Sequence, residues 1–236
     1  GSSQSKYARS LLQACSAQGW RAGILNLRGA SGTPNRAARQ YHSGDTQDVA
    51  FLLPHIKQRA PTQPLFLVGF SLGGNVTVKY LGECGQGTHT NVVRAAVAVS
   101  TPFDLAACAE HIRQGFAKVY LRALMKDLTT LGKAKFASYA AQGLTMPIAQ
   151  PQWDKLKDFQ DFDNAFTAAL SGYASGADYY AQCSSKPFVP WVRTPLLILQ
   201  AKDDPFMPAS VIPDAADCPA CVTLEASAHG GHVGFL

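Results

Sequence analysis

The pentapeptide GFSLG at residues 69–73 places one serine, Ser71, between two glycines. It follows the apolar run LFLV and precedes residues that suit a helix. A serine at a sharp turn between a buried strand and a helix is the usual setting of a nucleophile for acyl transfer. Gly69 and Gly73 are expected to leave room there for a strained backbone. The pattern therefore predicts a nucleophile at Ser71 rather than an ordinary glycine-rich turn.

A serine hydroxyl needs a base to take its proton, and the base needs an acid to orient it. Two acids, Asp203 and Asp204, follow the strand-like segment 195–200, and the carboxyl end of a parallel strand is where such groups belong. We favour Asp204, because Pro205 fixes the backbone after it, and keep Asp203 as the alternative. Asp104 is a third candidate, although its position suits the N-cap of a helix better.

The histidine is expected last in the chain order of serine, acid and histidine. The loop sequence EASAHGGHVGF carries His229 and His232 after one further strand-like segment. We favour His232 as the base, since it lies further from the strand and is flanked by Gly231 and Val233. His229 is expected to support the loop. The order in the chain therefore agrees with a Ser71, Asp204 and His232 triad.

The elements that must position these residues alternate between strand and helix. Apolar runs predict strands at 21–27, 65–68, 92–99, 195–200 and 221–225, and helical spacing predicts helices at 5–18, 45–59, 72–83 and 209–216. Asp45 is expected to be the N-cap of the second helix. The alternation predicts an α/β fold with a mostly parallel sheet and helices on both of its faces.

From about 103 to 190 the pattern becomes helical, aromatic-rich and irregular, and the α/β rhythm returns after it. We interpret this stretch as a helical cap inserted into one sheet, so that residues 1–236 form a single domain. Tyr179 and Tyr180 lie in it and have two readings, as lining of a substrate pocket or as ordinary packing.

Composition excludes several classes of protein. The 236 residues are 47% hydrophobic and 16% charged, which argues against disorder, and the net charge of +5 is scattered rather than gathered into a nucleic-acid-binding stripe. No apolar run has the length of a membrane span. Six spread cysteines suggest reduced thiols and a cytoplasmic location, and the CxxC at 218–221 lacks the partners of a zinc site.

Several motifs together resemble the YheT-like branch of the α/β-hydrolase superfamily. They are GFSLGGN, NLRGASG, RQYHSGDTQD, the AKDDPF loop and HGGHVGF, and they extend over almost the whole chain. The resemblance implies an α/β-hydrolase fold with a helical cap, a triad of Ser71, Asp204 and His232, and no cofactor or metal. It also implies a serine esterase of lipase type that acts on a small-molecule acyl ester.

The mechanism expected from these residues is ester hydrolysis through an acyl-enzyme, with the Leu72 N–H in the oxyanion hole. A thioesterase or peptidase with the same triad, and a non-catalytic binding module with this fold, remain as alternatives. Transient contact with lipid is compatible with each of these functions. The substrate, the preferred acyl chain length and the oligomeric state stay open at this stage.

The resemblance also implies how the ends of this chain compare with those of the family's members. The family carries a His-Gly loop that donates an oxyanion-hole N–H before a Gly-Ser-Ser stretch, and this chain opens on Gly-Ser-Ser. We therefore expect a domain truncated at both ends, without the early strands, that donor and a closing helix. Loss of one oxyanion donor costs ~10²–10³ in rate, so low activity is expected of the fragment.

Overall fold

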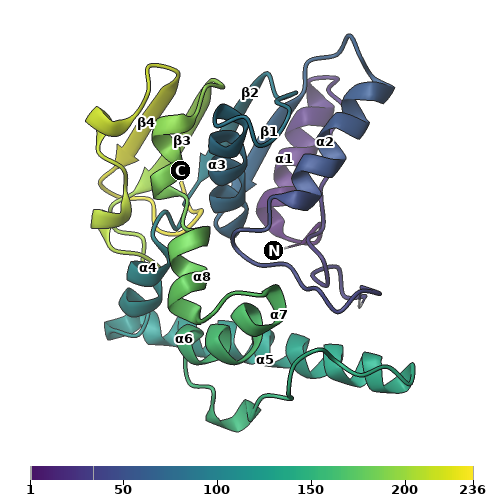
Figure 1. The fold of residues 1–236 in the computed structure, drawn as a ribbon. Coiled ribbons are helices and arrows are strands. Elements are labelled where there is room, and N and C mark those ends of the chain that lie inside the picture. The colour runs from purple at the N-terminus through teal and green to yellow at the C-terminus, as the bar shows by residue number, and fades with distance from the viewer. Residues whose placement is uncertain (1, 34, 236) are drawn as a thin grey trace. The chain divides into compact units, whose positions relative to one another are not determined.

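The computed structural model describes residues 2–33 and 35–235 and divides the chain into two compact units (Figure 1). Unit 1 comprises Gly1–His42 and Ala123–Gly176, and unit 2 comprises Ser43–Arg122 and Ala177–Leu236. In the described part of the chain, all four strands belong to unit 2 and unit 1 contains only helices and loops.

Unit 2 is built on a sheet in which all three pairings are parallel. The strands follow one another in space as they do in sequence: β1 (Phe66–Phe70), β2 (Ala95–Val99), β3 (Leu196–Ala201) and β4 (Val222–Ser227). This confirms the predicted parallel sheet. Because every strand points the same way, the loops that leave the strands all start at one edge of the sheet.

Helix α3 (Leu72–Gly85) follows β1 directly and packs against β1 and β2. Nine consecutive residues of α3 are buried, and Tyr80 and Leu81 are fully inaccessible. The 3₁₀ segment η4 (Lys186–Trp191) packs against α3. The core of unit 2 therefore centres on α3 and includes buried side chains of β2, β3 and η4.

The remaining helical elements of unit 2 are shorter or lie on its surface. They are α2 (Gln47–Arg59), α4 (Leu105–His111), η1 (Gly115–Ala117), the first turn of α5 (Lys118–Ala141), α8 (Gly176–Cys183, from Ala177 on), η5 (Ala209–Val211) and η6 (Ala215–Asp217). Helix α2 contributes Val49 and Leu53 to the core. Asp104 caps α4 by accepting a hydrogen bond from the Ala107 N–H at 3.0 Å, as expected from the sequence.

Unit 1 contains the rest of α5 and several short elements. These are α1 (Lys6–Ala17), η2 (Trp153–Lys155), α6 (Phe159–Phe162), the π-helical turn η3 (Asp163–Ala168) and α7 (Ala169–Ser171). Its core is an aromatic cluster in which Phe166 lies 5.3–6.4 Å from the rings of Phe136, Trp153 and Phe162. No helix among the described residues combines the length and the apolar character needed to cross a membrane.

Three local expectations are wrong. Residues 21–27 form no strand, because a strand requires a neighbour to complete its hydrogen bonds and this segment pairs with none of the described strands. The N-cap of α2 is Thr46 and not Asp45. Residues 209–216 form only two short 3₁₀ turns, since Pro213 forces Ile212 into an extended conformation between them, with ψ at 131°.

The stretch from 103 to 190 is helical, with α4 at its start and η4 at its end. Its middle part, 123–176, groups with residues 1–42 in unit 1. The interpretation of this stretch as a cap within one domain stays a prediction.

Asn75 joins three segments of unit 2 at the start of α3. Its side-chain amide is fully buried and donates to the carbonyls of Ser43 at 2.9 Å and Cys183 at 2.7 Å, while its oxygen accepts from the Ser185 N–H at 3.0 Å. One side chain thus satisfies two buried backbone groups and one part-buried one, which would otherwise each cost free energy.

We predict that Asn75→Ala lowers the free energy of unfolding by about 3 kcal/mol, since three hydrogen bonds of a fully buried side chain, of about 1 kcal/mol each, are lost. Asn91→Ala, at an exposed asparagine that also bonds to Thr194 and Val93, is the control and should cost under about 1 kcal/mol. Urea unfolding of both variants measures the difference. Equal losses would contradict the role assigned to Asn75.

Candidate active site

Ser71 lies at the corner between β1 and α3. Its backbone has φ 52° and ψ −122°, a region that residues with a side chain rarely adopt. Two backbone hydrogen bonds fix the corner. The Ser71 N–H donates to the Val99 carbonyl at 2.8 Å, and the Ser71 carbonyl accepts from the Gly74 N–H at 2.8 Å. The strained corner expected from the sequence is therefore present.

The two glycines of the pentapeptide have different roles. A Cβ at Gly69 would lie 2.2 Å from the Gly73 carbonyl oxygen and 2.4 Å from the Thr77 hydroxyl, so only glycine fits there. A Cβ at Gly73 would meet nothing within 4 Å. The expectation of close backbone approach therefore holds at Gly69 and is wrong for Gly73, where the side-chain direction faces open space.

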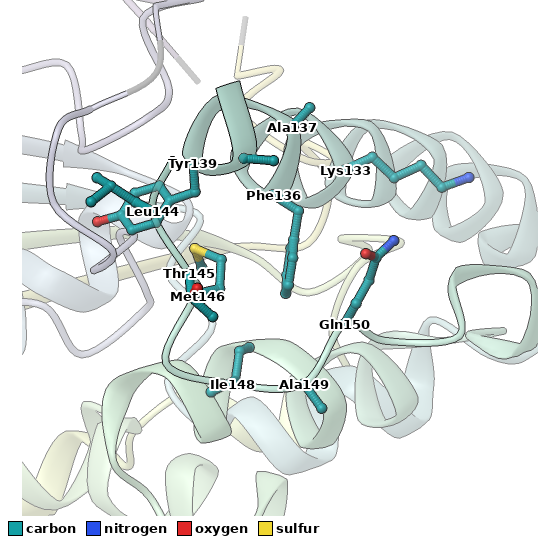
Figure 2. A pocket seen from close by; sticks show the side chains of 11 residues that line it. Lys133, Phe136, Ala137, Tyr139, Leu144, Thr145, Met146, Ile148, Ala149 and Gln150 are labelled. Carbon is teal, nitrogen blue, oxygen red and sulfur yellow. The ribbon is translucent and has the colours of Figure 1, made fainter. Parts of the chain in front are cut away.

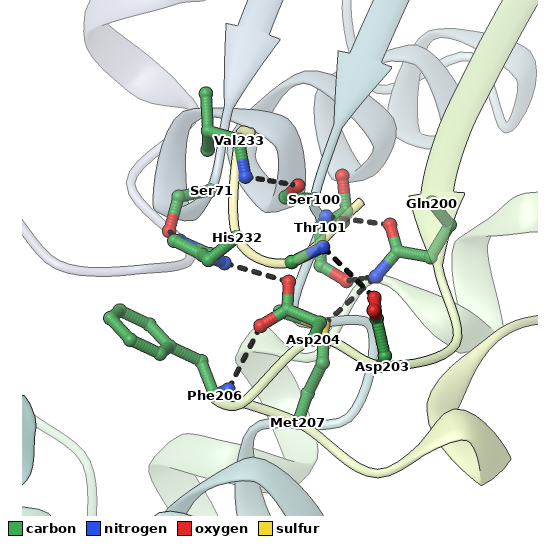
Figure 3. Close-up of polar contacts among 11 residues, drawn as sticks. Ser71, Ser100, Thr101, Gln200, Asp203, Asp204, Phe206, Met207, His232 and Val233 are labelled. Carbon is green, nitrogen blue, oxygen red and sulfur yellow. Dashed lines mark hydrogen bonds and ion pairs between the residues drawn. The ribbon is translucent and has the colours of Figure 1, made fainter. Parts of the chain in front are cut away.

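Ser71, His232 and Asp204 form one hydrogen-bonded chain (Figure 3). His232 Nε2 lies 2.9 Å from Ser71 Oγ, and His232 Nδ1 lies 2.7 Å from Asp204 Oδ2. All three residues belong to unit 2. The imidazole thus touches the serine hydroxyl with one nitrogen and a carboxylate with the other.

Asp204 is buried, and its environment holds it in place. Its second oxygen, Oδ1, accepts from the Phe206 N–H at 2.8 Å. The Phe206 ring stacks on the His232 ring, with centroids 4.1 Å apart and planes 18° from parallel. Because a buried carboxylate must have its oxygens satisfied by hydrogen bonds, these contacts hold the Asp204 side chain in place beside Nδ1 of His232.

Asp203, the alternative acid, lies outside that chain. It is exposed and accepts from the Gly231 N–H at 2.9 Å, while its other oxygen lies 3.2 Å from His229 Nδ1. The Gly231 N–H holds the pKa of Asp203 below its ordinary value. A lowered pKa means that the charged form favours the folded loop, so this contact persists as the pH falls and is lost only on passing through the lowered pKa.

The loop after β2 also takes part in the site, which the sequence reasoning missed. Ser100 is fully buried, and its hydroxyl accepts from the Val233 N–H at 3.0 Å. Gln200, also fully buried, accepts from the Thr101 N–H at 2.9 Å and so joins the ends of β2 and β3. The signal that could have indicated Ser100 is its position, directly after a strand, which matches that of Ser71.

Other groups near the site do not compete with Ser71. Cys108 is buried, and this burial, followed by the nearby charges of Asp104 and Asp204, raises the pKa of its thiol, so the thiol stays protonated. Tyr179 and Tyr180 are buried as packing residues, and the Tyr179 hydroxyl accepts from the Ser43 N–H at 2.9 Å.

Within 2–33 and 35–235, no three His, Cys, Asp or Glu side chains lie close enough together to hold a metal ion.

A hollow of about 560 Å³ lies in unit 1, between the C-terminal half of α5 and the segment 144–150 (Figure 2). Phe136 and Met146 supply apolar surface, and Lys133 and Gln150 lie at its edge. Most of its lining residues are exposed, so it is an open depression. It contains none of the candidate residues of unit 2.

Comparisons with family models and with known proteins place the chain in the same family. The model of the α/β hydrolase fold family matches residues 1–236. "Putative esterase YheT" of Escherichia coli strain K12 is 41% identical over 236 residues, which are all of this chain and 68% of that protein. Monoacylglycerol lipase of Saccharomyces cerevisiae is 28% identical over 240 residues, which cover this whole chain and 53% of the lipase.

The solved structures show the same fold at much lower identity. The esterase PF2001 of Pyrococcus furiosus superimposes with a TM-score of 0.60 at 16% identity, over 99% of this chain and 70% of that one. The chain therefore spans about two thirds of YheT and about half of the yeast lipase. With a family match over its full length and 41% identity to YheT, the chain belongs to the YheT-like, esterase-type branch of the α/β-hydrolase fold family.

Proposed function

We propose that the intact protein hydrolyses carboxylic esters of acyl or lipid type through a triad of Ser71, His232 and Asp204. The observation that carries this proposal is the pair of hydrogen bonds on the His232 ring, 2.9 Å to Ser71 Oγ and 2.7 Å to Asp204 Oδ2. These lengths fall in the range expected of a nucleophile, its base and the group that orients the base. Membership in an esterase-type branch supports the same chemistry.

In the first step Ser71 Oγ attacks the ester carbonyl carbon while His232 Nε2 takes the hydroxyl proton. Asp204 accepts the Nδ1 hydrogen bond, which fixes the tautomer with a free Nε2 lone pair and stabilises the imidazolium that forms. The proton then passes from Nε2 to the departing alkoxide, leaving an acyl group on Ser71. Burial of Asp204 strengthens its charge interaction with the imidazolium, since little water screens it.

The negative charge that develops on the carbonyl oxygen needs hydrogen-bond donors. Leu72 is the first residue of α3, where backbone N–H groups have no partner within the helix. The helix also directs the positive end of its dipole to this point. We therefore assign the Leu72 N–H to the oxyanion hole. In the second step, water attacks the acyl-enzyme with His232 again as the base.

The surface beside His232 favours an apolar acyl group. Phe206 stacks on His232, Tyr120 lies 5.1 Å from Phe206, and Phe116 lies 5.9 Å from Tyr120, as measured between ring centroids. We call Phe206, Tyr120 and Phe116 the aromatic row. Its outer end is open, with Phe116 74% exposed and Val119 beside it 52% exposed. The row leads from the candidate base to accessible apolar side chains, which suit the hydrocarbon part of a substrate.

We predict that Asp204→Asn lowers kcat for p-nitrophenyl esters by ~10³–10⁴, because the amide no longer fixes the tautomer of His232. Asp203→Asn is the matched control and should stay within about threefold of the unchanged protein, since Asp203 has no contact with the His232 ring and an amide oxygen can still accept from the Gly231 N–H. Ser71→Ala should remove both turnover and labelling by a fluorophosphonate probe. A loss confined to Asp203→Asn, or labelling that survives Ser71→Ala, would contradict the assignment.

We predict that Phe116→Ser lowers kcat/KM for p-nitrophenyl decanoate by about tenfold and leaves that for the acetate within twofold. Removing one ring contact costs about 1.5 kcal/mol only when a long chain covers the ring. Phe51→Ser, at a phenylalanine that is 77% exposed on α2, is the matched control and should leave both esters unchanged. Parallel declines for both esters would show that the aromatic row does not contact the acyl chain.

A further inference from the structure

The loop that carries His232 has a strained backbone. Gly231 has φ 56° and Val233 has φ 59°, so the residues on both sides of His232 lie in the left-handed region. That conformation is open to glycine but is a marked exception for a β-branched residue such as valine. A loop of this kind keeps its shape only when its surroundings impose it.

Two side chains hold this loop by its backbone amides. Asp203 Oδ1 accepts from the Gly231 N–H at 2.9 Å, and Ser100 Oγ accepts from the Val233 N–H at 3.0 Å. These are the peptide N–H groups on either side of His232. Figure 3 shows the contact between Ser100 and the Val233 N–H, apart from the contact between His232 and Asp204.

Ser100 and Asp203, whose side chains accept these two hydrogen bonds, both lie just after a strand of the sheet. Ser100 follows β2 directly, is fully buried, and donates its own N–H to Leu199 of β3 at 2.9 Å. Asp203 lies two residues beyond β3, and the intervening Lys202 N–H donates to Ser227 at the end of β4 at 2.9 Å. The backbone beside both acceptors is therefore held by hydrogen bonds to neighbouring strands of the sheet.

We propose that Ser100 and Asp203 are positioning residues that fix His232 by clamping the two amides around it. The inference rests on the proposed function, because it concerns the base of that reaction. Neither residue touches the imidazole or the Ser71 hydroxyl in the contacts described above. They act through the backbone of the loop.

The need for such a clamp follows from the geometry. Both ring nitrogens of His232 must keep their partners at once, and a catalytic constellation tolerates about 0.5 Å of displacement. The contact with Asp204 alone leaves the loop backbone free to move away from Ser71. A displacement of about 1 Å can cost about 10² in rate. Two hydrogen bonds, one to the residue before His232 and one to the residue after it, restrict that freedom at the backbone.

The other partner of Asp203 is not needed for this role. The His229 side chain is 90% exposed, and surface ion pairs contribute little. The hydrogen bond from the Gly231 N–H is also the largest cause of the lowered pKa of Asp203. An amide oxygen at the same position can accept that N–H as a carboxylate does. The clamp therefore requires a hydrogen-bond acceptor at residue 203, and it does not require the negative charge of the Asp203 carboxylate.

Four variants of the intact protein test the clamp: Asp203→Ala, Asp203→Asn, Ser100→Ala and His229→Ala. We expect Asp203→Ala and Ser100→Ala each to lower kcat for p-nitrophenyl acetate by about 10–10²-fold with KM within twofold. Asp203→Asn restores the acceptor and should stay within about threefold of the unchanged protein, as should His229→Ala. Rescue by Asn, which Ala does not give, separates positioning by an acceptor from a requirement for charge.

A second readout does not depend on turnover. In the unchanged protein, the His232 Nδ1–H that bonds to Asp204 should give a downfield proton resonance. Asp203→Ala and Ser100→Ala should broaden or abolish this resonance, while Asp203→Asn and His229→Ala keep it. If the unchanged protein hydrolyses no ester, the proposed function fails, but the resonance still tests the clamp.

Wild-type kcat and an intact resonance in both alanine variants would overturn the proposal. Equal losses in Asp203→Asn and Asp203→Ala would overturn the part that assigns an acceptor role to residue 203. Urea unfolding checks that each variant is folded. Ser100→Ala removes a single oxygen, so it decides the matter even if Asp203→Ala does not fold.

Discussion

The candidate site depends on the two hydrogen bonds of one imidazole ring. His232 must reach Ser71, which lies 161 positions earlier in the chain, and Asp204, which lies 28 positions earlier. No local sequence rule brings such distant residues within 3 Å of one ring. The parallel sheet does so, since its strands all end at one edge and release the loops of Ser71, Ser100, Asp204 and His232 there.

Backbone strain gathers at the same edge. Among the described residues, the non-glycine residues with positive φ are Ser71, Ser100 and Val233. Each belongs to the candidate site or contacts a residue that does. Conformations of this kind cost of order 1–3 kcal/mol each and persist where the surrounding structure imposes them. Here the register between β1, β2 and β3, the buried Gln200 and the backbone of α3 provide those constraints.

Much of this arrangement is predictable from the sequence, because it depends on periodicity and order. Apolar runs indicated the four strands that form the sheet, and the pentapeptide around Ser71 indicated the corner between β1 and α3. The strand expected at 21–27 failed because hydrophobic alternation does not reveal whether a neighbour is present to pair with it. The helix expected near 209–216 failed because the local effect of Pro213 outweighed the helical pattern.

The hydrogen bond between Ser100 and Val233 is not predictable from the sequence, for a different physical reason. A serine after a strand is common, and its importance comes from a hydrogen bond to an amide 133 positions later. The sequence favours Asp204 over Asp203 but does not decide between them, since two adjacent residues in a loop differ mainly in the direction of their side chains. In the structure the two carboxylates divide the tasks: Asp204 bonds to the ring of His232, and Asp203 to the backbone beside it.

The central claim is that Ser71 forms the covalent bond to the acyl group. Mass spectrometry of the intact protein after rapid acid quench with an activated ester tests it directly, because the acyl adduct survives digestion and can be mapped to one residue. We expect a mass increase equal to the acyl group on the peptide that contains Ser71, at a time before the second turnover. Ester turnover without an adduct at Ser71, or with the adduct on another residue, would contradict it.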